Sequence, residues 1–240
     1  MVSQPKSWKS WDHRCLEPGT AGRGNWLYPI APNLYPIFVS RSSSLAGVIL
    51  AAGASSRMGE EKALLQYGGR SFLAGAIELL QNACDFVIVV AGKNIDVLRP
   101  VVYQNSAYLV LNPQPEVGQS SSLRLGLQAV LERGRDAACV TLVDRPPAQL
   151  KTLQTLKQHF LGTSPETTWA VVPQFESKHG HPVIFAREMM EALLRASPSS
   201  NAREIEHQHQ QRIEYLEVDD PRVVLNINTP EDYSSLTATR

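Results

Sequence analysis

The run from Phe86 to Ala91 constrains the fold of this chain more than any other feature. It reads Phe-Val-Ile-Val-Val-Ala, so a strand formed by it would present apolar side chains on both of its faces. Strands that are buried on both faces are typical of parallel sheets covered by helices on both sides. The run therefore predicts a buried strand of an α/β protein.

Similar apolar runs alternate with segments of helical spacing from residue 45 onward. The predicted strands are 46–50, 86–91, 108–111, 137–143, 169–172, 182–185 and 223–227. The predicted helices are 71–82, 95–101, 120–133, 148–160, 187–196 and 202–208. Units of a strand and a helix in this order stack into a mostly parallel sheet. We therefore expect one α/β domain over residues 45–240, a length that can build a single core.

Residues 1–44 differ from the rest of the chain. They contain five prolines and three glycines and show no sustained periodicity. Such a composition is typical of irregular or disordered segments. We expect an irregular segment before the domain, although its tryptophans leave open that it docks onto another surface.

The charges of the chain balance, with 23 lysines and arginines against 23 aspartates and glutamates. A protein without net charge has no broad field that attracts nucleic acid or an anionic membrane, so we expect neither as a partner. Any anion must then bind at a local site.

The three cysteines, Cys15, Cys84 and Cys139, are odd in number and form no Cys-x-x-Cys pair. This pattern argues against a disulfide framework and a zinc site, and we expect Cys84 and Cys139 to be buried thiols. No apolar run approaches the roughly 20 residues of a membrane span, and no secretory signal starts the chain. A cytoplasmic location is expected.

The loop after the first predicted strand has the composition of a phosphate-binding loop. It reads Leu50-Ala-Ala-Gly53-Ala-Ser-Ser-Arg57-Met-Gly59-Glu-Glu-Lys62. Its small residues let backbone N–H groups approach a phosphate chain, and Arg57 and Lys62 add positive charge. It is neither a Walker A loop nor a dinucleotide fingerprint, because the glycines and the Lys-Ser/Thr pair of those motifs are missing. Taken alone, an ordinary turn explains it equally well.

Further polar residues follow other predicted strands, where α/β sheets bind ligands. Asp144 stands between an apolar strand and Arg145-Pro-Pro, a position suited either to a metal ligand or to a helix cap. A site with few protein oxygens suits Mg²⁺, which keeps waters and takes substrate phosphates as ligands. Asn228 is the candidate partner of Asp144, because Asn226 and Asn228 share one side of the predicted last strand. Thr229 and Asp232 form a variant capping box and are expected to be structural.

His179 and His181 lie on one face if the chain between them is extended, a spacing that can chelate zinc. Zinc sites normally need three or four ligands, and no third ligand in a comparable setting follows. Contact with a substrate, or simple turn polarity, is therefore favoured over a metal.

Four motifs in order resemble the molybdenum cofactor cytidylyltransferase family. They are Leu50–Lys62, Gly118-Gln-Ser-Ser-Ser-Leu-Arg-Leu-Gly126, Asp144-x-Pro146 with Gly180-His181-Pro182, and Asn226-Ile-Asn-Thr-Pro-Glu-Asp232. The resemblance covers residues from about 45 to the C-terminus and implies a Rossmann-like three-layer nucleotidyltransferase fold. Related guanylyltransferases usually read Leu-Ala-Gly-Gly at the loop start, so Ala52 points to the cytidine branch. Arg145 departs from the small, amide or Met residue usual in the family, and Asn226 and Asn228 stand where Asp is more frequent.

The resemblance implies transfer of CMP from CTP to a phosphorylated pterin of the molybdopterin type, with release of pyrophosphate. The nucleophile is an ionised phosphate oxygen, so catalysis is positioning and charge neutralisation by Arg57, Lys62 and Asp144. Mg²⁺ is assigned to Asp144 and Asn228. The residues assigned to the nucleotide are Leu50, Ala51, Ala52, Gly53, Ser55, Arg57, Gly59, Lys62, Gly118 and Ser122. The residues assigned to the pterin are Gly180, His181 and Pro182.

Three alternatives stay open at this point. A related enzyme of the same fold uses GTP as donor, or a sugar phosphate as acceptor. A third alternative is a non-catalytic module that binds the cofactor and delivers it to a molybdoenzyme. A molybdoenzyme or its chaperone is also the expected protein partner of an enzyme of this family.

Overall fold

The computed structural model describes residues 44–53, 59, 61–197 and 200–238. Within them, an eight-stranded sheet has the strand order β10-β7-β9-β6-β1-β4-β5, and β8 pairs with β7. The strands of this sheet are β1 (Ala46–Ala51), β4 (Phe86–Ala91), β5 (Tyr108–Leu111), β6 (Ala137–Leu142), β7 (Ala170–Phe175), β8 (Lys178–His179), β9 (Val183–Ala186) and β10 (Ile213–Glu217). All pairings on the path are parallel except those of β9, which runs antiparallel to both of its neighbours. The predicted mostly parallel sheet is confirmed.

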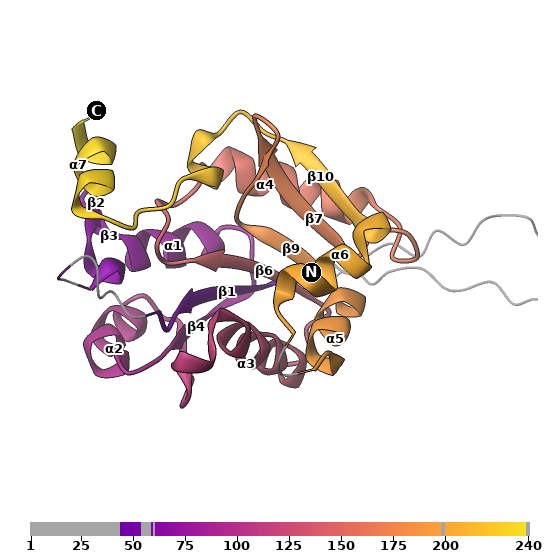
Figure 1. Ribbon diagram of the computed structural model, residues 1–240, viewed down its shortest axis with the longest axis horizontal. Helices are drawn as coiled ribbons and strands as arrows, with labels where there is room; N and C mark the ends of the chain where they lie inside the picture. The colour runs from indigo at the N-terminus through magenta and orange to yellow at the C-terminus, as the bar shows by residue number, and fades with distance from the viewer. Residues whose placement is uncertain (1–43, 54–58, 60, 198–199, 239–240) are drawn as a thin grey trace, which may run out of the picture. The chain divides into compact units, whose positions relative to one another are not determined.

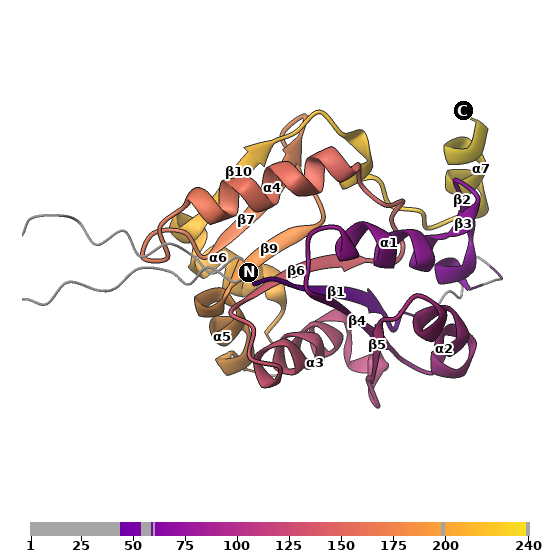
Figure 2. The same ribbon diagram turned by 180° about the vertical axis from the view of Figure 1, so that it is seen from behind.

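Helices cover both faces of the sheet and make three layers (Figure 1, Figure 2). The helices are α1 (Phe72–Gln81), α2 (Ile95–Gln104), α3 (Gln119–Glu132), α4 (Leu150–Gly162), α5 (Arg187–Arg195), α6 (Ala202–Gln208) and α7 (Pro230–Ala238). Core residues of α1, α2 and α4 pack on one face, and those of α3, α5 and α6 pack on the other. Short 3-10 helices are η1 (Lys62–Leu64), η2 (Pro115–Val117), η3 (Gln210–Arg212) and η4 (Pro221–Val224). A small hairpin, β2 (Gln66–Tyr67) and β3 (Arg70–Ser71), stands apart from the large sheet.

The apolar run of β4 is buried on both of its faces. Val87 and Val89 belong to the core on the α1 side, whereas Ile88 and Val90 belong to the core on the α3 side. All four side chains are inaccessible to solvent. Successive residues of a strand point to opposite faces, so an uninterrupted apolar run needs a helix layer on each side. The interpretation of this run from the sequence is confirmed.

Gly126 lets α3 pack closely against β1 and β4. A Cβ atom at this position would lie 2.6 Å from Cγ1 of Val48 and 3.2 Å from Cγ2 of Val90. Both neighbours are β-branched and cannot swing away. We predict that Gly126→Ala lowers the free energy of unfolding by about 1–3 kcal/mol through overpacking.

Chemical denaturation measures the effect of Gly126→Ala, and Gly162→Ala is the matched control. Gly162 is also helical, but a Cβ atom there has nothing within 4 Å. Alanine is the better helix former, so Gly162→Ala should be neutral or stabilising by up to about 1 kcal/mol. Equal effects of the two substitutions would contradict the packing argument.

The prediction of a last strand over residues 223–227 is wrong. Its first residues belong to η4, and the chain from there to α7 is irregular. The strand at this edge of the sheet is β10, which the sequence analysis did not predict. Its sequence, Ile-Glu-Tyr-Leu-Glu, has only Ile213 buried, because an edge strand is not enclosed on both faces.

Backbone hydrogen bonds explain why residues 223–227 do not join the sheet. The carbonyl oxygen of Val223 accepts a hydrogen bond of 2.9 Å from the N–H of His181, and the N–H of Ile227 donates to the carbonyl oxygen of Asp144 at 2.9 Å. These partners lie beyond the ends of strands rather than in a strand ladder. The segment therefore passes over the end of β6, which brings Asn228 to Asp144.

Cys84 and Cys139 are buried free thiols, as predicted. The hydrogen bond with Cys84, together with burial, raises the pKa of Cys139 well above its usual value. A protonated buried thiol is unreactive. Cys15 and the rest of residues 1–43 lie outside the described residues, so the irregular segment predicted there stays a prediction. In the part of the chain that the structure describes, no helix has the length and apolarity needed to cross a membrane.

Candidate active site

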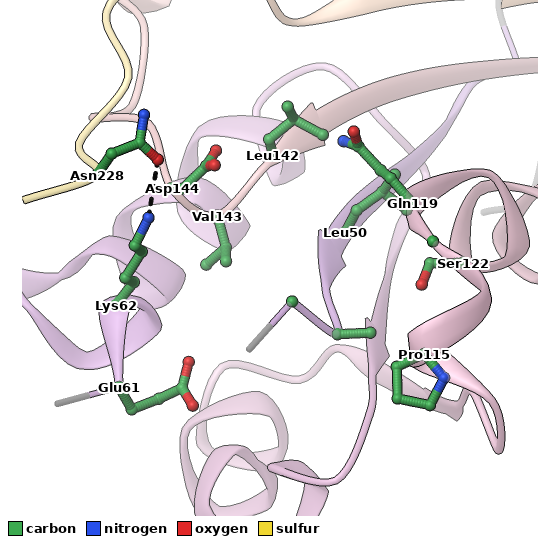
Figure 3. A pocket seen from close by; sticks show the side chains of 13 residues that line it. Leu50, Glu61, Lys62, Pro115, Gln119, Ser122, Leu142, Val143, Asp144 and Asn228 are labelled. Atoms are coloured by element: carbon green, nitrogen blue, oxygen red, sulfur yellow. Dashed lines mark hydrogen bonds between the residues drawn. The ribbon is translucent and has the colours of Figure 1, made fainter. Parts of the chain in front are cut away.

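A cavity of about 260 Å³ lies at the carboxyl ends of β1 and β6 (Figure 3). This is where open α/β sheets bind ligands. Most residues predicted to bind the nucleotide or the metal line it, namely Leu50, Ala52, Gly53, Lys62, Gly118, Ser122, Asp144 and Asn228. Its lining is completed by Glu61, Pro115, Gln119, Leu142 and Val143. We refer to it as the first cavity.

Two residues assigned to the nucleotide do not line this cavity. The side chain of Ala51 is buried in the core on the α1 side, and its carbonyl oxygen accepts a hydrogen bond of 2.9 Å from Nδ2 of Asn94. Gly59 is exposed and has a φ of 73°. Ser55 and Arg57 lie outside the described residues, so their assignments stay predictions.

Lys62 and Asn228 meet at one end of the first cavity. Nζ of Lys62 donates a hydrogen bond of 3.0 Å to Oδ1 of Asn228, although the two residues are far apart in the sequence (Figure 3). Asn228 is held at the start of α7, where Asp232 accepts hydrogen bonds from the N–H groups of Asn228 and Thr229. These hydrogen bonds lower the pKa of Asp232, and the one from Asn228 has the largest effect. The predicted capping role of Thr229 and Asp232 is confirmed.

Asp144 has a carboxylate oxygen that lacks a partner among the residues that the structure describes. Its Oδ1 is buried and accepts no hydrogen bond within the described residues. Burying a charged oxygen that is not satisfied costs free energy, unless a ligand satisfies it. Asp144 and Asn228 both line the first cavity and both offer oxygens, which are the ligands that hard divalent cations prefer. These residues therefore fit a divalent cation that takes its other ligands from water and phosphate.

The alternative role of Asp144 as a helix cap is wrong. The first turn of α4 is held by Asp220, whose Oδ2 accepts hydrogen bonds from the N–H of Gln149 at 2.6 Å and from Oγ1 of Thr152 at 2.9 Å. Asp220 is fully buried. The sequence analysis missed it because 76 positions separate Asp144 and Asp220 and no local pattern shows which one reaches α4.

The other end of the first cavity is held by Asn112, which the sequence analysis did not assign to the site. Its side chain is buried and donates hydrogen bonds to Oγ of Ser121 at 2.8 Å and Oγ of Ser122 at 2.9 Å, while its Oδ1 accepts from the N–H of Gln114. Gly118, the residue that precedes α3, has a φ of 115°. Glycine suits this backbone conformation, which other residues rarely adopt. A polar residue directly after β5 is the signal that identifies Asn112.

A second cavity of about 640 Å³ adjoins the first. The two share the lining residues Leu50, Gly118, Gln119 and Leu142. The second cavity is further lined by Arg145 and His181 beyond the sheet and by residues of α6 and the turn before it, among them Arg203 and Glu206. A ligand in each cavity would meet its neighbour across the end of β6.

His181 is the predicted pterin contact that lines the second cavity. Its Nδ1 lies 3.4 Å from the carbonyl oxygen of Val140. Burial and the positive charge of Arg145 lower the pKa of His181 to about 4, against the opposite effect of the Val140 carbonyl. The imidazole is therefore neutral at physiological pH and adds no charge to the cavity.

Gly180 and Pro182, the other predicted pterin contacts, do not line either cavity and instead set the path of the chain at His181. A Cβ atom at Gly180 would lie 2.4 Å from the carbonyl oxygen of Val223, so only glycine fits beneath η4. Pro182 follows His181 through a cis peptide bond. The ring of His179 stacks on that of Tyr215, with 4.0 Å between centroids, and His179 is outside the second cavity.

The arrangement suits the binding of a polyphosphate with a divalent cation. The first cavity places a lysine, a carboxylate and an amide beside the small residues Ala52 and Gly53 at the end of β1. Positive charge and backbone N–H groups bind phosphates, and the carboxylate binds the cation that phosphates accompany. The adjoining second cavity provides room for a second substrate.

Comparison with known proteins agrees with this interpretation. A family model described as MobA-like NTP transferase domain matches residues 47–213. A probable molybdenum cofactor guanylyltransferase of Rhodopirellula baltica is 29% identical over 196 residues, which are 78% of this chain and 89% of that protein. The molybdenum cofactor cytidylyltransferase of Escherichia coli is 22% identical over 194 residues, which are 80% of this chain and 94% of the relative. Among solved structures, Rv0371c from Mycobacterium tuberculosis H37Rv is 26% identical with a TM-score of 0.69, covering 81% of this chain and 98% of that one.

Proposed function

The chain belongs to the family of MobA-like NTP transferase domains and is an enzyme of the nucleotidyltransferase kind, and we propose that it transfers CMP from CTP to the phosphorylated pterin of the molybdenum cofactor. The observation that carries this proposal is the first cavity. It combines Ala52 and Gly53 after β1, the amine of Lys62 and the carboxylate of Asp144, whose buried Oδ1 has no partner among the described residues. The relatives act on the molybdenum cofactor by name, which supports the acceptor.

The reaction forms a bond between a phosphate oxygen of the acceptor and the α-phosphorus of CTP. The bond from the α-phosphorus to the pyrophosphate oxygen breaks, and its electron pair leaves with pyrophosphate. The attacking oxygen is already ionised, so the site needs no general base. Its residues act by holding the two substrates in line and by neutralising charge.

Lys62 and Asp144 divide the neutralisation of charge between them. The amine of Lys62, held by Asn228, binds the β- and γ-phosphates of the donor and stabilises the leaving pyrophosphate. Asp144 and Asn228 would hold Mg²⁺, which supplies positive charge to the triphosphate when bound. Arg57 is proposed to bind the same phosphates. A solved structure similar to this chain, Rv0371c, is described as a complex with manganese, which supports a divalent metal here.

CTP is proposed as donor because of Ala52. The related guanylyltransferases usually have glycine at this point of the loop, and Ala52 lines the first cavity beside Gly53 and Pro115. Its methyl group narrows the space for the base, which favours the smaller pyrimidine ring. Both donor types occur among the named relatives, so this residue is the main support for cytidine.

We predict that Ala52→Gly shifts the donor preference toward GTP. One group of methyl size supplies roughly tenfold discrimination, so the ratio of kcat/KM for CTP to that for GTP should fall about tenfold. The measurement is pyrophosphate release from CTP, GTP, ATP and UTP, each with molybdopterin and Mg²⁺, for the wild type and the variant. A wild-type enzyme that prefers GTP would contradict the assignment of the donor.

The same assay separates the other candidate functions. A sugar-phosphate nucleotidyltransferase releases pyrophosphate with a sugar phosphate and not with molybdopterin. A module that only binds and delivers the cofactor binds the nucleotide without releasing pyrophosphate. Delivery of the product to a molybdoenzyme or its chaperone is part of the proposal, and a pull-down with the product-loaded enzyme tests it.

A further inference from the structure

The dipeptide Asp144-Arg145 faces both cavities. Asp144 lines the first cavity, and Arg145, the next residue, lines the second. The cavities adjoin at the end of β6, where Leu142 lines both of them. A negative and a positive side chain are therefore placed on the two sides of the boundary at which two substrates would meet.

The guanidinium of Arg145 has few partners among the residues that the structure describes. Its Nη1 donates a hydrogen bond of 2.8 Å to the carbonyl oxygen of Val223, and its buried Nε has no partner among these residues. In the described part of the chain, no carboxylate forms an ion pair with it within 4.0 Å. A guanidinium stays charged in proteins, and a partly buried charge that is not paired costs free energy. An anion that binds to the guanidinium of Arg145 offsets this cost in free energy.

The charges of the other ionisable groups that line the second cavity are compatible with an anionic ligand. His181 is neutral at physiological pH, Arg203 adds a second positive charge, and Glu206 is the acidic residue of the lining. Burial raises the pKa of Glu206, and the positive charge of Arg203 opposes this effect. The balance of charge in this cavity therefore favours an anionic ligand.

We propose that Arg145 binds the phosphate of the acceptor and directs it toward the α-phosphorus of the donor nucleotide. This inference rests on the proposed function, because it concerns the acceptor of that reaction. Guanidinium groups bind phosphate through two parallel hydrogen bonds, which fixes orientation as well as position. Arg145 is thus a residue that contacts substrate, whereas its bond to Val223 holds the side chain in place.

Steady-state kinetics of Arg145→Gln tests this role. We expect the KM for the acceptor to rise at least tenfold, while the KM for the nucleotide changes less than twofold. Arg145→Lys keeps the charge but loses the paired hydrogen bonds, so its KM for the acceptor should lie between those of the wild type and Arg145→Gln. If Arg145 acted only through its hydrogen bond to Val223, the KM for the acceptor and the KM for the nucleotide would rise equally. That result would overturn the proposal.

Arg212→Gln is the matched control. The guanidinium of Arg212 also donates a hydrogen bond to a carbonyl oxygen, that of Glu166 at 2.6 Å, but Arg212 lines neither cavity. This variant should change neither KM. A tenfold change of the acceptor KM in Arg212→Gln would show that such losses come from the fold, and would overturn the assignment of Arg145.

A binding experiment without turnover separates this inference from the proposed function. The first cavity is filled with Mg²⁺ and whichever nucleoside triphosphate stabilises the protein most against heat, and inorganic phosphate is then titrated by calorimetry. Wild-type protein should bind phosphate in the millimolar range, and Arg145→Gln should bind it at least tenfold more weakly. This holds even if molybdopterin is not the acceptor. Equal phosphate binding by both proteins, or none by the wild type, overturns the role of Arg145 whichever acceptor the enzyme uses.

Discussion

Asp144→Ala is expected to lower kcat by a factor on the order of 10²–10⁴ while leaving the protein folded. The substitution removes the carboxylate assigned to the metal, and the triphosphate then lacks the charge neutralisation of the transition state. It also removes a buried oxygen that has no partner in the described residues. The free energy of unfolding of the protein without metal should therefore be unchanged or raised, because active sites commonly trade stability for function.

Asp220→Ala is the matched control for this prediction. Asp220 is also a carboxylate near the end of a sheet strand, but it is fully buried and satisfied by Gln149 and Thr152. Its loss removes the acceptor of those two donors and of Arg222, which donates to Oδ1 of Asp220. The free energy of unfolding should fall by about 1–3 kcal/mol. The folded fraction of this variant should keep its kcat. If Asp144→Ala keeps near wild-type turnover, or if Asp220→Ala loses turnover without losing stability, the assignment of the two carboxylates is wrong.

Lys62→Ala is expected to lower kcat/KM for the nucleotide by about 10²-fold, with a higher KM for the nucleotide and a lower kcat. Its amine is proposed to bind the donor phosphates both before and during transfer, so both constants should change. Asn228→Ala should have a smaller effect of the same kind, since Asn228 positions the amine through a bond of 3.0 Å.

Kinetics of the two single variants and the double variant measure how far Lys62 and Asn228 act together. The effects of substituting residues in contact are coupled. The factor by which kcat/KM falls in the double variant should therefore be smaller than the product of the factors for the two single variants. Independent losses would show that Asn228 acts through the metal assigned to it and Asp144 rather than through Lys62. A Lys62→Ala effect confined to the KM of the acceptor would contradict the role of Lys62 in binding the nucleotide.

The central part of the fold was predictable because its signals are local. Strands β1, β4 and β6 are apolar on both faces, and such runs leave few alternatives to a buried strand. The edge was less predictable. Strand β10 has an ordinary surface composition. Residues 223–227 have the composition of a strand, but Val223 accepts a backbone hydrogen bond from His181 and Ile227 donates one to Asp144.

The candidate site was predictable where a residue follows a strand directly. Asp144, Ala52 and Gly53 are of this kind, and all three line the first cavity. Asn228 was assigned to the same site on the wrong argument, because it reaches Asp144 through an irregular segment rather than a strand. Asn112 and Asp220 act through hydrogen bonds to distant parts of the chain, which no short motif shows. The lining of the second cavity by Arg145 likewise follows from tertiary structure.

Transfer of a radioactive α-phosphate tests the central claim most directly. The purified protein is incubated with molybdopterin, Mg²⁺ and either CTP or GTP labelled at the α-phosphorus, and the pterin is separated from the nucleotides. We expect label from CTP to appear in the pterin product with one pyrophosphate released per labelled molecule, and Asp144→Ala to form labelled product at least about 10²-fold more slowly at the same enzyme concentration. Label that enters the pterin from GTP rather than CTP, or that never leaves the nucleotide, would contradict the central claim.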